Sequence, residues 1–141
     1  MSEIIVDDLT GKTSAGDITV TSEGGAVTMQ LQQGLAKVWF LLEGDIGTPV
    51  FRDSLNGSSV TDNGTGDYTA FFSNSFNSND NALTTDAGYT QNVGGTYLAS
   101  SYYYSTQTNQ RRIRCSSFSN IASSTLTDCE QIGASIFGDL A

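Results

Sequence analysis

Two runs of sequence decide the fold: Val38-Trp39-Phe40-Leu41-Leu42, with the only tryptophan of the chain, and Val60-Thr61-Asp62-Asn63-Gly64-Thr65-Gly66-Asp67-Tyr68-Thr69-Ala70-Phe71-Phe72. Both lie within residues 36–72, which supply most of the large apolar side chains that a core requires. In the second run, Asn63-Gly64 separates residues of high β-propensity. Asn and Gly both tolerate positive φ, so this dipeptide predicts a tight hairpin turn. The stretch therefore predicts paired antiparallel strands.

The composition favours an all-β protein. Of the 141 residues only 15% are charged, whereas Ser, Thr, Asn and Gly are abundant; about a quarter is the usual charged share. No window has Leu, Ala, Glu and Lys at helical spacing. Short alternating segments between turn residues predict an antiparallel β-sandwich or a jelly-roll-like domain.

The pattern beyond the central stretch predicts further strands and one irregular region. Strands are expected at residues 94–106, 111–118, 126–129 and 132–137. Residues 72–92, rich in Asn, Ser and Asp, are expected to be weakly structured. The apolar end of the chain, residues 136–141, is expected to pack in a sheet rather than fray.

The organisation predicts an N-terminal arm at residues 1–33 and a C-terminal β domain at residues 34–141. Short β-like segments are expected at residues 4–9, 17–21 and 27–31, and no aromatic residue precedes Trp39. An isolated hairpin is marginal in water. We therefore expect the arm to find its core on another chain, as an attachment or trimer-forming segment.

Charge and cysteine content restrict the partners and the compartment. The net charge of −9 argues against nucleic acid, because phosphate binding needs clustered Lys and Arg. No apolar run is long enough to cross a membrane, and no signal-peptide pattern is visible, so folding in a cytosol is expected. There Cys115 and Cys129 are expected to be reduced and buried, with a disulfide between them as the alternative.

Few catalytic groups are available. The chain has no histidine, which excludes Ser-His and Cys-His pairs, and two cysteines cannot complete a four-ligand zinc site. Asx-rich turns explain Asn79-Asp80-Asn81 and Asp62-Asn63-Gly64, with a loop cation as the alternative. A carboxylate pair acting on a glycosidic bond is the remaining enzymatic possibility. We expect a protein without enzymatic activity, cofactor or metal.

The best candidates for a contact surface are aromatic and basic. In a strand, Tyr103 faces opposite to Tyr102 and Tyr104. Tyrosine combines an apolar ring with a polar tip, which suits a subunit interface or stacking on a sugar. Arg112 and Arg114 are expected to share the face of their strand that points away from Ile113 and Cys115. This short basic patch favours a hairpin arm or a subunit contact over a nucleic-acid footprint.

Several of these segments resemble a module of tailed-bacteriophage virion proteins, especially of aquatic phages. The resemblance is carried by Arg52-Asp53-Ser54-Leu55-Asn56-Gly57-Ser58-Ser59-Val60-Thr61-Asp62-Asn63-Gly64-Thr65-Gly66-Asp67-Tyr68-Thr69, Ala36-Lys37-Val38-Trp39, Ile136-Phe137-Gly138-Asp139 and Leu9-Thr10-Gly11-Lys12-Thr13-Ser14-Ala15-Gly16. The chain departs from the module at Glu43-Gly44-Asp45-Ile46-Gly47, which replaces its usual turn, and residues 73–110 are unlike it.

The resemblance implies a homotrimeric fibre or spike component of a tail or head, assembled in the host cytoplasm and located in the virion. Its arm would contact other virion proteins, and its exposed β domain would contact a host-surface glycan or protein. A capsid decoration protein that stabilises the shell is the alternative, and a glycan depolymerase is a remote one.

Overall fold

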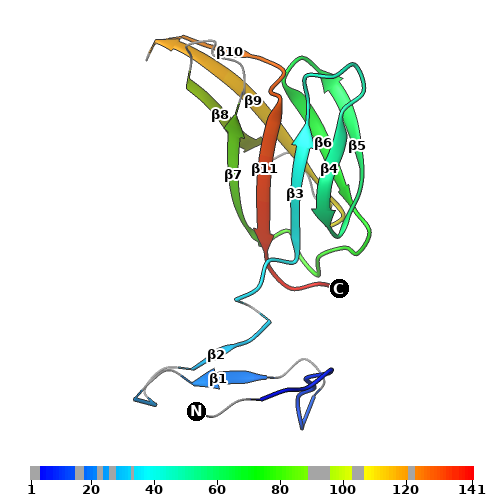
Figure 1. Ribbon diagram of the computed structural model, residues 1–141, viewed down its shortest axis with the longest axis vertical. Coiled ribbons are helices and arrows are strands. Elements are labelled where there is room, and N and C mark those ends of the chain that lie inside the picture. The colour runs from blue at the N-terminus through cyan, green and yellow to red at the C-terminus, as the bar shows by residue number, and fades with distance from the viewer. Residues whose placement is uncertain are drawn as a thin grey trace. The chain divides into compact units, whose positions relative to one another are not determined.

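The structure is a computed structural model that describes residues 4–14, 18–21, 24–25, 28–32, 34–88, 96–102, 107–120 and 123–141. It divides into two compact units, Met1–Leu35 and Ala36–Ala141. All the regular secondary structure in the described residues is β-strand, and all paired strands are antiparallel (Figure 1). The prediction of an all-β fold is therefore confirmed.

The first unit contains one two-stranded sheet. Strand β1 (Thr19–Thr21) pairs with β2 (Thr28–Gln30), and the Leu31 amide donates to the Ile18 carbonyl at 2.7 Å. The expected β-like segment at residues 4–9 was wrong, since no strand forms there. A segment without a partner strand has no ladder of hydrogen bonds to fix it.

The second unit is a β-sandwich of two sheets (Figure 1). One sheet has five strands: β5 (Gly57–Gly64), β6 (Asp67–Phe72), β8 (Thr96–Tyr102), β9 (Gln110–Asn120) and β10 (Ser123–Leu126). Its order is β10-β9-β6-β5, with β8 also paired to β9. The other has four strands in the order β4-β3-β11-β7: β3 (Val38–Glu43), β4 (Val50–Leu55), β7 (Ala82–Gly88) and β11 (Gln131–Phe137).

The core lies between the two sheets and follows from alternation along the strands. In β3 and β11 every second side chain is buried, because successive side chains of a strand point to opposite faces. The same alternation places Ile113 and Cys115 of β9 inward. The buried apolar set is Val38, Phe40, Leu42, Tyr68, Ala70, Phe72, Phe76, Ala99, Ile113, Cys115, Cys129, Ile132, Ala134 and Ile136.

Three predictions about local structure in the domain were wrong. Residues 82–88 form strand β7 rather than a weakly structured region, because their backbone pairs along the whole of β11. Residues 127–129 form no strand; β10 ends at Leu126. The β5–β6 turn falls at Thr65-Gly66, two residues beyond Asn63-Gly64, and the register shifts in a bulge at Asn63. The end of the chain does pack, through backbone pairing of Leu140 with Phe76.

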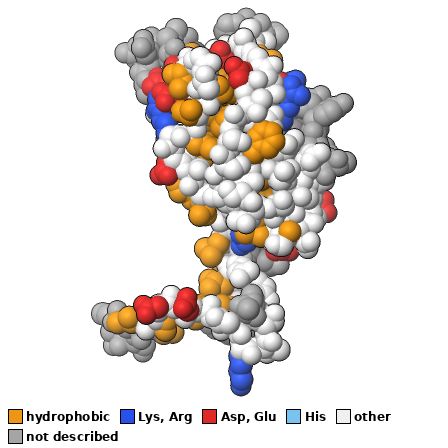
Figure 2. Space-filling view, turned by 90° about the vertical axis from the view of Figure 1, so that its right-hand side faces the viewer, with side chains coloured by type: hydrophobic (Ala, Val, Ile, Leu, Met, Phe, Trp, Pro, Cys, Tyr) orange, Lys and Arg blue, Asp and Glu red, His pale blue; other side chains and the backbone are white. Residues whose placement is uncertain are grey.

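One face of the domain, shown in Figure 2, is mostly polar and uncharged: white atoms predominate there, and the hydrophobic areas are separate. Trp39, on the outward side of β3, is 37% exposed beside Leu55 of β4. Scattered apolar side chains of this kind are normal on soluble proteins.

The tip of the β5–β6 hairpin is bound closely to the segment before β11. A Cβ on Gly66 would lie 2.5 Å from the Cys115 carbonyl oxygen and 2.6 Å from the Thr127 nitrogen, and Gly66 has a φ of +65°. Only glycine satisfies both conditions. The Gly66 amide also donates to Oδ1 of Asp128 at 2.6 Å. The turn is thus fixed by backbone contact, not by turn propensity alone.

Tyr68 extends this contact into the core. Its hydroxyl lies 2.8 Å from Oδ1 of Asp128 and 2.9 Å from the Gly44 carbonyl oxygen, and the side chain is 1% exposed. The single hydroxyl proton is shared by these two acceptors. Burial, followed by the hydrogen bond to the Asp128 carboxylate, raises the pKa of Tyr68. The tyrosine is therefore held in its neutral form.

Cys115 and Cys129 form a disulfide, so the expectation of reduced cysteines was wrong. The prediction that both would be buried is confirmed, at 0% exposure each. Their Cα atoms are 6.4 Å apart, within the range that a disulfide spans. The bond covalently joins β9 to the segment beside Asp128.

Removing the disulfide is expected to destabilise the domain. The bond joins residues 14 positions apart in the sequence. For a loop of this size, the restriction of the unfolded chain stabilises the folded state by about 3 kcal/mol. Denaturant unfolding of the Cys115→Ala, Cys129→Ala double variant should show this loss. Reductant should lower the stability of the parent chain to the same level and leave the variant unchanged; a parent chain insensitive to reductant would contradict the prediction.

Tyr68 predicts a loss of stability at alkaline pH. Below a pH of about 10 the hydroxyl is protonated in both the folded and the unfolded chain. Above that pH the unfolded chain releases the proton first, because the folded pKa is raised, so the free energy of unfolding falls as pH rises. Unfolding of the parent and Tyr68→Phe chains should show a smaller alkaline loss for the variant. Equal slopes would contradict this prediction.

Candidate contact site

The outer face of β6 and β9 carries a cluster of charged side chains. The antiparallel register places Asp67 opposite Arg114 and Thr69 opposite Arg112. Residues directly opposite on one face of a pair lie close enough for their side chains to interact. These four residues therefore form one patch, on the side of the sheet that faces away from the core.

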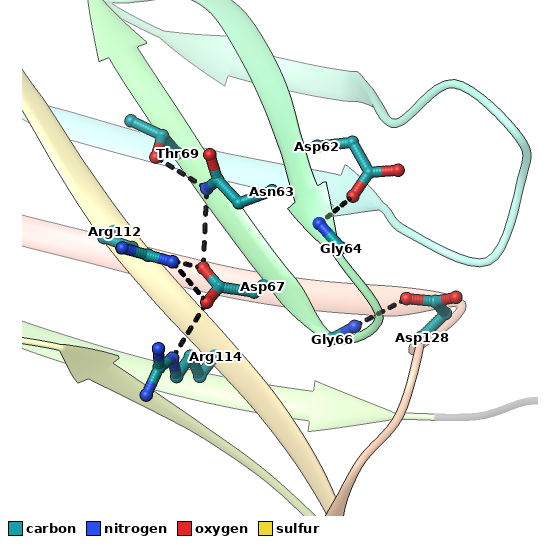
Figure 3. Close-up of polar contacts among 9 residues, drawn as sticks. All are labelled: Asp62, Asn63, Gly64, Gly66, Asp67, Thr69, Arg112, Arg114 and Asp128. Atoms are coloured by element: carbon teal, nitrogen blue, oxygen red, sulfur yellow. Dashed lines mark hydrogen bonds and ion pairs between the residues drawn. The ribbon is translucent and has the colours of Figure 1, made fainter.

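Asp67 binds both arginines through its two oxygens (Figure 3). Arg112 donates from Nε to Oδ1 at 2.6 Å and from Nη2 to Oδ2 at 2.7 Å, and Arg114 donates from Nε to Oδ2 at 2.9 Å. The first pair is bidentate, the strongest geometry for an arginine and a carboxylate. The Asp67 side chain is 7% exposed, whereas both arginine side chains are 33% exposed. The carboxylate is thus the buried centre and the guanidinium groups form its outer edge.

The pKa of Asp67 reflects two opposing effects. Burial raises it, and the hydrogen bonds and charges of Arg112 and Arg114 lower it. The arginines prevail, and the pKa of Asp67 lies below its ordinary value. The carboxylate is therefore ionised whenever the domain is folded near neutral pH.

Asn63 connects the hairpin bulge to this cluster. Its Nδ2 donates to Oγ1 of Thr69 at 2.9 Å and lies 3.4 Å from Oδ1 of Asp67. Beside it, the Gly64 amide donates to Oδ1 of Asp62 at 2.8 Å. The cluster and the bulge thus share one network of hydrogen bonds (Figure 3).

The structure brings together part of the predicted contact residues. Arg112 and Arg114 share a face of β9, as their alternation indicated, and both bind one carboxylate. The backbone of Tyr102, the last residue of β8, pairs with Arg112, and its side chain lies outside the described residues. Tyr103 and Tyr104 also lie outside them.

Sequence reasoning missed Asp67, the centre of the cluster. Asp67 follows Gly66 next to the predicted hairpin turn, and nothing in its local sequence indicates a charged partner. The available signal was the pair Arg112 and Arg114 at two-residue spacing, which requires a counter-charge on an adjacent strand. Only the register between β6 and β9 identifies that residue.

The chemistry of the cluster is that of a fixed polar surface. Within the described ranges, no group of three or more His, Cys, Asp or Glu side chains is placed to hold a metal ion. Likewise, no helix there is long and apolar enough to span a membrane. The guanidinium groups of Arg112 and Arg114, whose side chains are each 33% exposed, form the solvent-facing edge of this surface.

Comparison of the chain with protein-family models, with curated proteins and with solved structures finds no match. The site is therefore interpreted from its own geometry.

Replacing Asp67 by Asn is expected to lower the free energy of unfolding by about 2–3 kcal/mol at neutral pH, because two arginines lose their shared counter-charge. The folded pKa is depressed, so this contribution is present above the unfolded pKa of about 3.9 and is lost as pH falls through the folded pKa. Denaturant unfolding of the parent and Asp67→Asn chains should therefore show a stability gap that closes in acid.

The exposed ion pair of Arg52 with Glu43 provides a matched control. Solvent screens such surface pairs, and they contribute little to stability. Arg52→Gln should leave the unfolding midpoint nearly unchanged at neutral pH. A loss as large as that of Asp67→Asn would show that burial of the carboxylate is not what makes the Asp67 cluster important.

Proposed function

We propose that this chain is a non-enzymatic structural protein of a tailed-bacteriophage virion, a fibre or spike component that trimerises through its N-terminal arm. In this proposal the β domain is exposed and contacts the host surface. The observation that carries it is the apolar surface of the arm. Ile4 is 85% and Ile5 83% exposed, and Val6 and Leu9 are also exposed, at 57% and 58%.

The small sheet of the arm supports the same proposal. Val20 and Met29 are directly opposite each other in the β1–β2 pair, and they are 40% and 56% exposed. A two-stranded sheet buries too little apolar surface to be stable alone. Additional copies of the arm, or other virion proteins, would cover these side chains.

The domain supports a structural role rather than a catalytic one. Of its carboxylates, Asp67 is bound by two arginines and Asp128 receives the Gly66 amide and the Tyr68 hydroxyl. Groups held in this way stabilise a fold. The mostly uncharged polar surface and the net charge of −9 suit an exposed virion component that does not bind nucleic acid.

Sedimentation of the full chain tests the trimer. We expect a trimer at micromolar concentration, and we expect Ile4→Ser with Ile5→Ser to weaken association by at least about tenfold, because each buried isoleucine contributes about 1.5–3 kcal/mol. Val50→Ser is the control, since Val50 of β4 is 43% exposed but lies in the domain. It should leave association unchanged. A parent chain that is strictly monomeric would contradict the proposal.

A map of the intact virus particle would test the location. Three copies at a tail or vertex fibre would support the proposed role. Density repeated over the capsid lattice would instead identify a decoration protein, and absence of the chain from the particle would refute both.

A further inference from the structure

The chain contains two Asn-Gly dipeptides in very different settings. Asn56-Gly57 joins β4 to β5, and Asn63-Gly64 lies in the bulge of β5. Asn-Gly is the dipeptide most prone to deamidation, since the glycine nitrogen is sterically free to attack the preceding side-chain amide. We propose that Asn63, and not Asn56, is a site of spontaneous deamidation whose product changes the charge of the Asp67 cluster.

Asn56 is protected by its contacts. Its Oδ1 accepts the Asn74 amide at 2.7 Å and its Nδ2 donates to the Asn74 carbonyl at 3.1 Å, so both ends of the side-chain amide are fixed. The following glycine is equally confined. A Cβ there would meet Oγ of Ser54 at 2.8 Å and a ring carbon of Phe51 at 2.9 Å. Neither the amide nor the nitrogen has room to move towards the other.

Asn63 is exposed and lies where the ladder is interrupted. The register between β5 and β6 shifts from Asp62 to Gly64, which leaves Asn63 as the extra residue of the bulge. Its side-chain amide is held through the nitrogen. A Cβ added to Gly64 would meet nothing within 4 Å, so the backbone there has open space.

The proton that must be removed already points at a base. The attacking atom is the Gly64 nitrogen, and its N–H donates to Oδ1 of Asp62 at 2.8 Å. A carboxylate in this position assists proton removal as the nitrogen approaches Cγ of Asn63.

The reaction balances with water as the only co-reactant. The bond from the Gly64 nitrogen to Cγ of Asn63 forms, the bond from Cγ to Nδ2 breaks, and ammonia leaves with the proton lost by the nitrogen. Water then opens the five-membered imide at either carbonyl, which gives aspartate or isoaspartate. No oxidant, reductant or second protein is required.

The product changes the adjoining cluster. The Asn63 Nδ2, which donates to Thr69 and lies 3.4 Å from Oδ1 of Asp67, leaves as ammonia, and a carboxylate takes the place of the side-chain amide. The new carboxylate beside Asp67 replaces a hydrogen-bond donor by a group with the same negative charge as Asp67. Arg112 and Arg114 then face two acids instead of one, so the charge of the candidate contact face depends on the age of the molecule.

Peptide mapping of the full chain after incubation at mildly alkaline pH tests the proposal, with Asn, Asp and isoAsp resolved at both positions. We expect Asn63 to convert at least about tenfold faster than Asn56, a barrier difference of about 1.4 kcal/mol. In denaturant the two sites should convert at similar rates. Conversion of Asn63 no faster than Asn56 in the folded chain would overturn the proposal.

Asp62→Ser tests the role of the base. Serine keeps a side-chain acceptor two residues before the bulge amide but removes the carboxylate. Asp62 is exposed, so the fold should be retained, as an unchanged circular dichroism spectrum would confirm. We expect conversion of Asn63 to slow severalfold while that of Asn56 stays the same. An unchanged rate at Asn63 would refute the assistance by Asp62.

Discussion

The sandwich depends on the close approach of the hairpin tip to the chain that enters β11. Gly66 has no space for a side chain because backbone atoms of Cys115 and Thr127 fill its surroundings. Its amide binds Asp128, and the next residue along is joined by the disulfide to β9. One short contact therefore connects both sheets. Hydrophobic burial is non-directional, and this contact is what selects one arrangement of the sheets over others with equal burial.

Strand β9 serves both faces of the molecule at once. Its inward residues Ile113 and Cys115 belong to the core. Arg112 and Arg114, which alternate with them, bind Asp67 on the outer face of the sheet. Because the same backbone positions both sets, a one-residue shift in its register would transfer Arg112 and Arg114 into the core. The cost of burying unpaired guanidinium groups there makes the observed register strongly preferred. The polar cluster thus specifies the fold as well as the surface.

The sequence predicted the fold class because alternation is a local property. In β11 every second residue is buried, and in β9 the buried residues Ile113 and Cys115 alternate with Arg112 and Arg114, a pattern visible in the sequence alone. Strand β7 was missed because its side chains are mostly small or polar, and its stability comes from backbone bonds to β11. The displaced turn and Asp67 were missed, and the disulfide was kept only as the alternative, for a related reason. Each depends on which strands become neighbours, and residues separated by 14 or more positions in sequence carry no local sign of that.

The disulfide also limits the effect of a proteolytic cut in the chain between its two cysteines. Cys115 and Cys129 enclose β10 and the end of β9 in a covalent ring. A cut of the backbone anywhere within this ring leaves the two fragments linked through sulfur, and strand β11, which pairs with both β3 and β7, stays attached to the rest of the domain. A single proteolytic cut in this segment therefore does not release the C-terminal strand β11 from the domain.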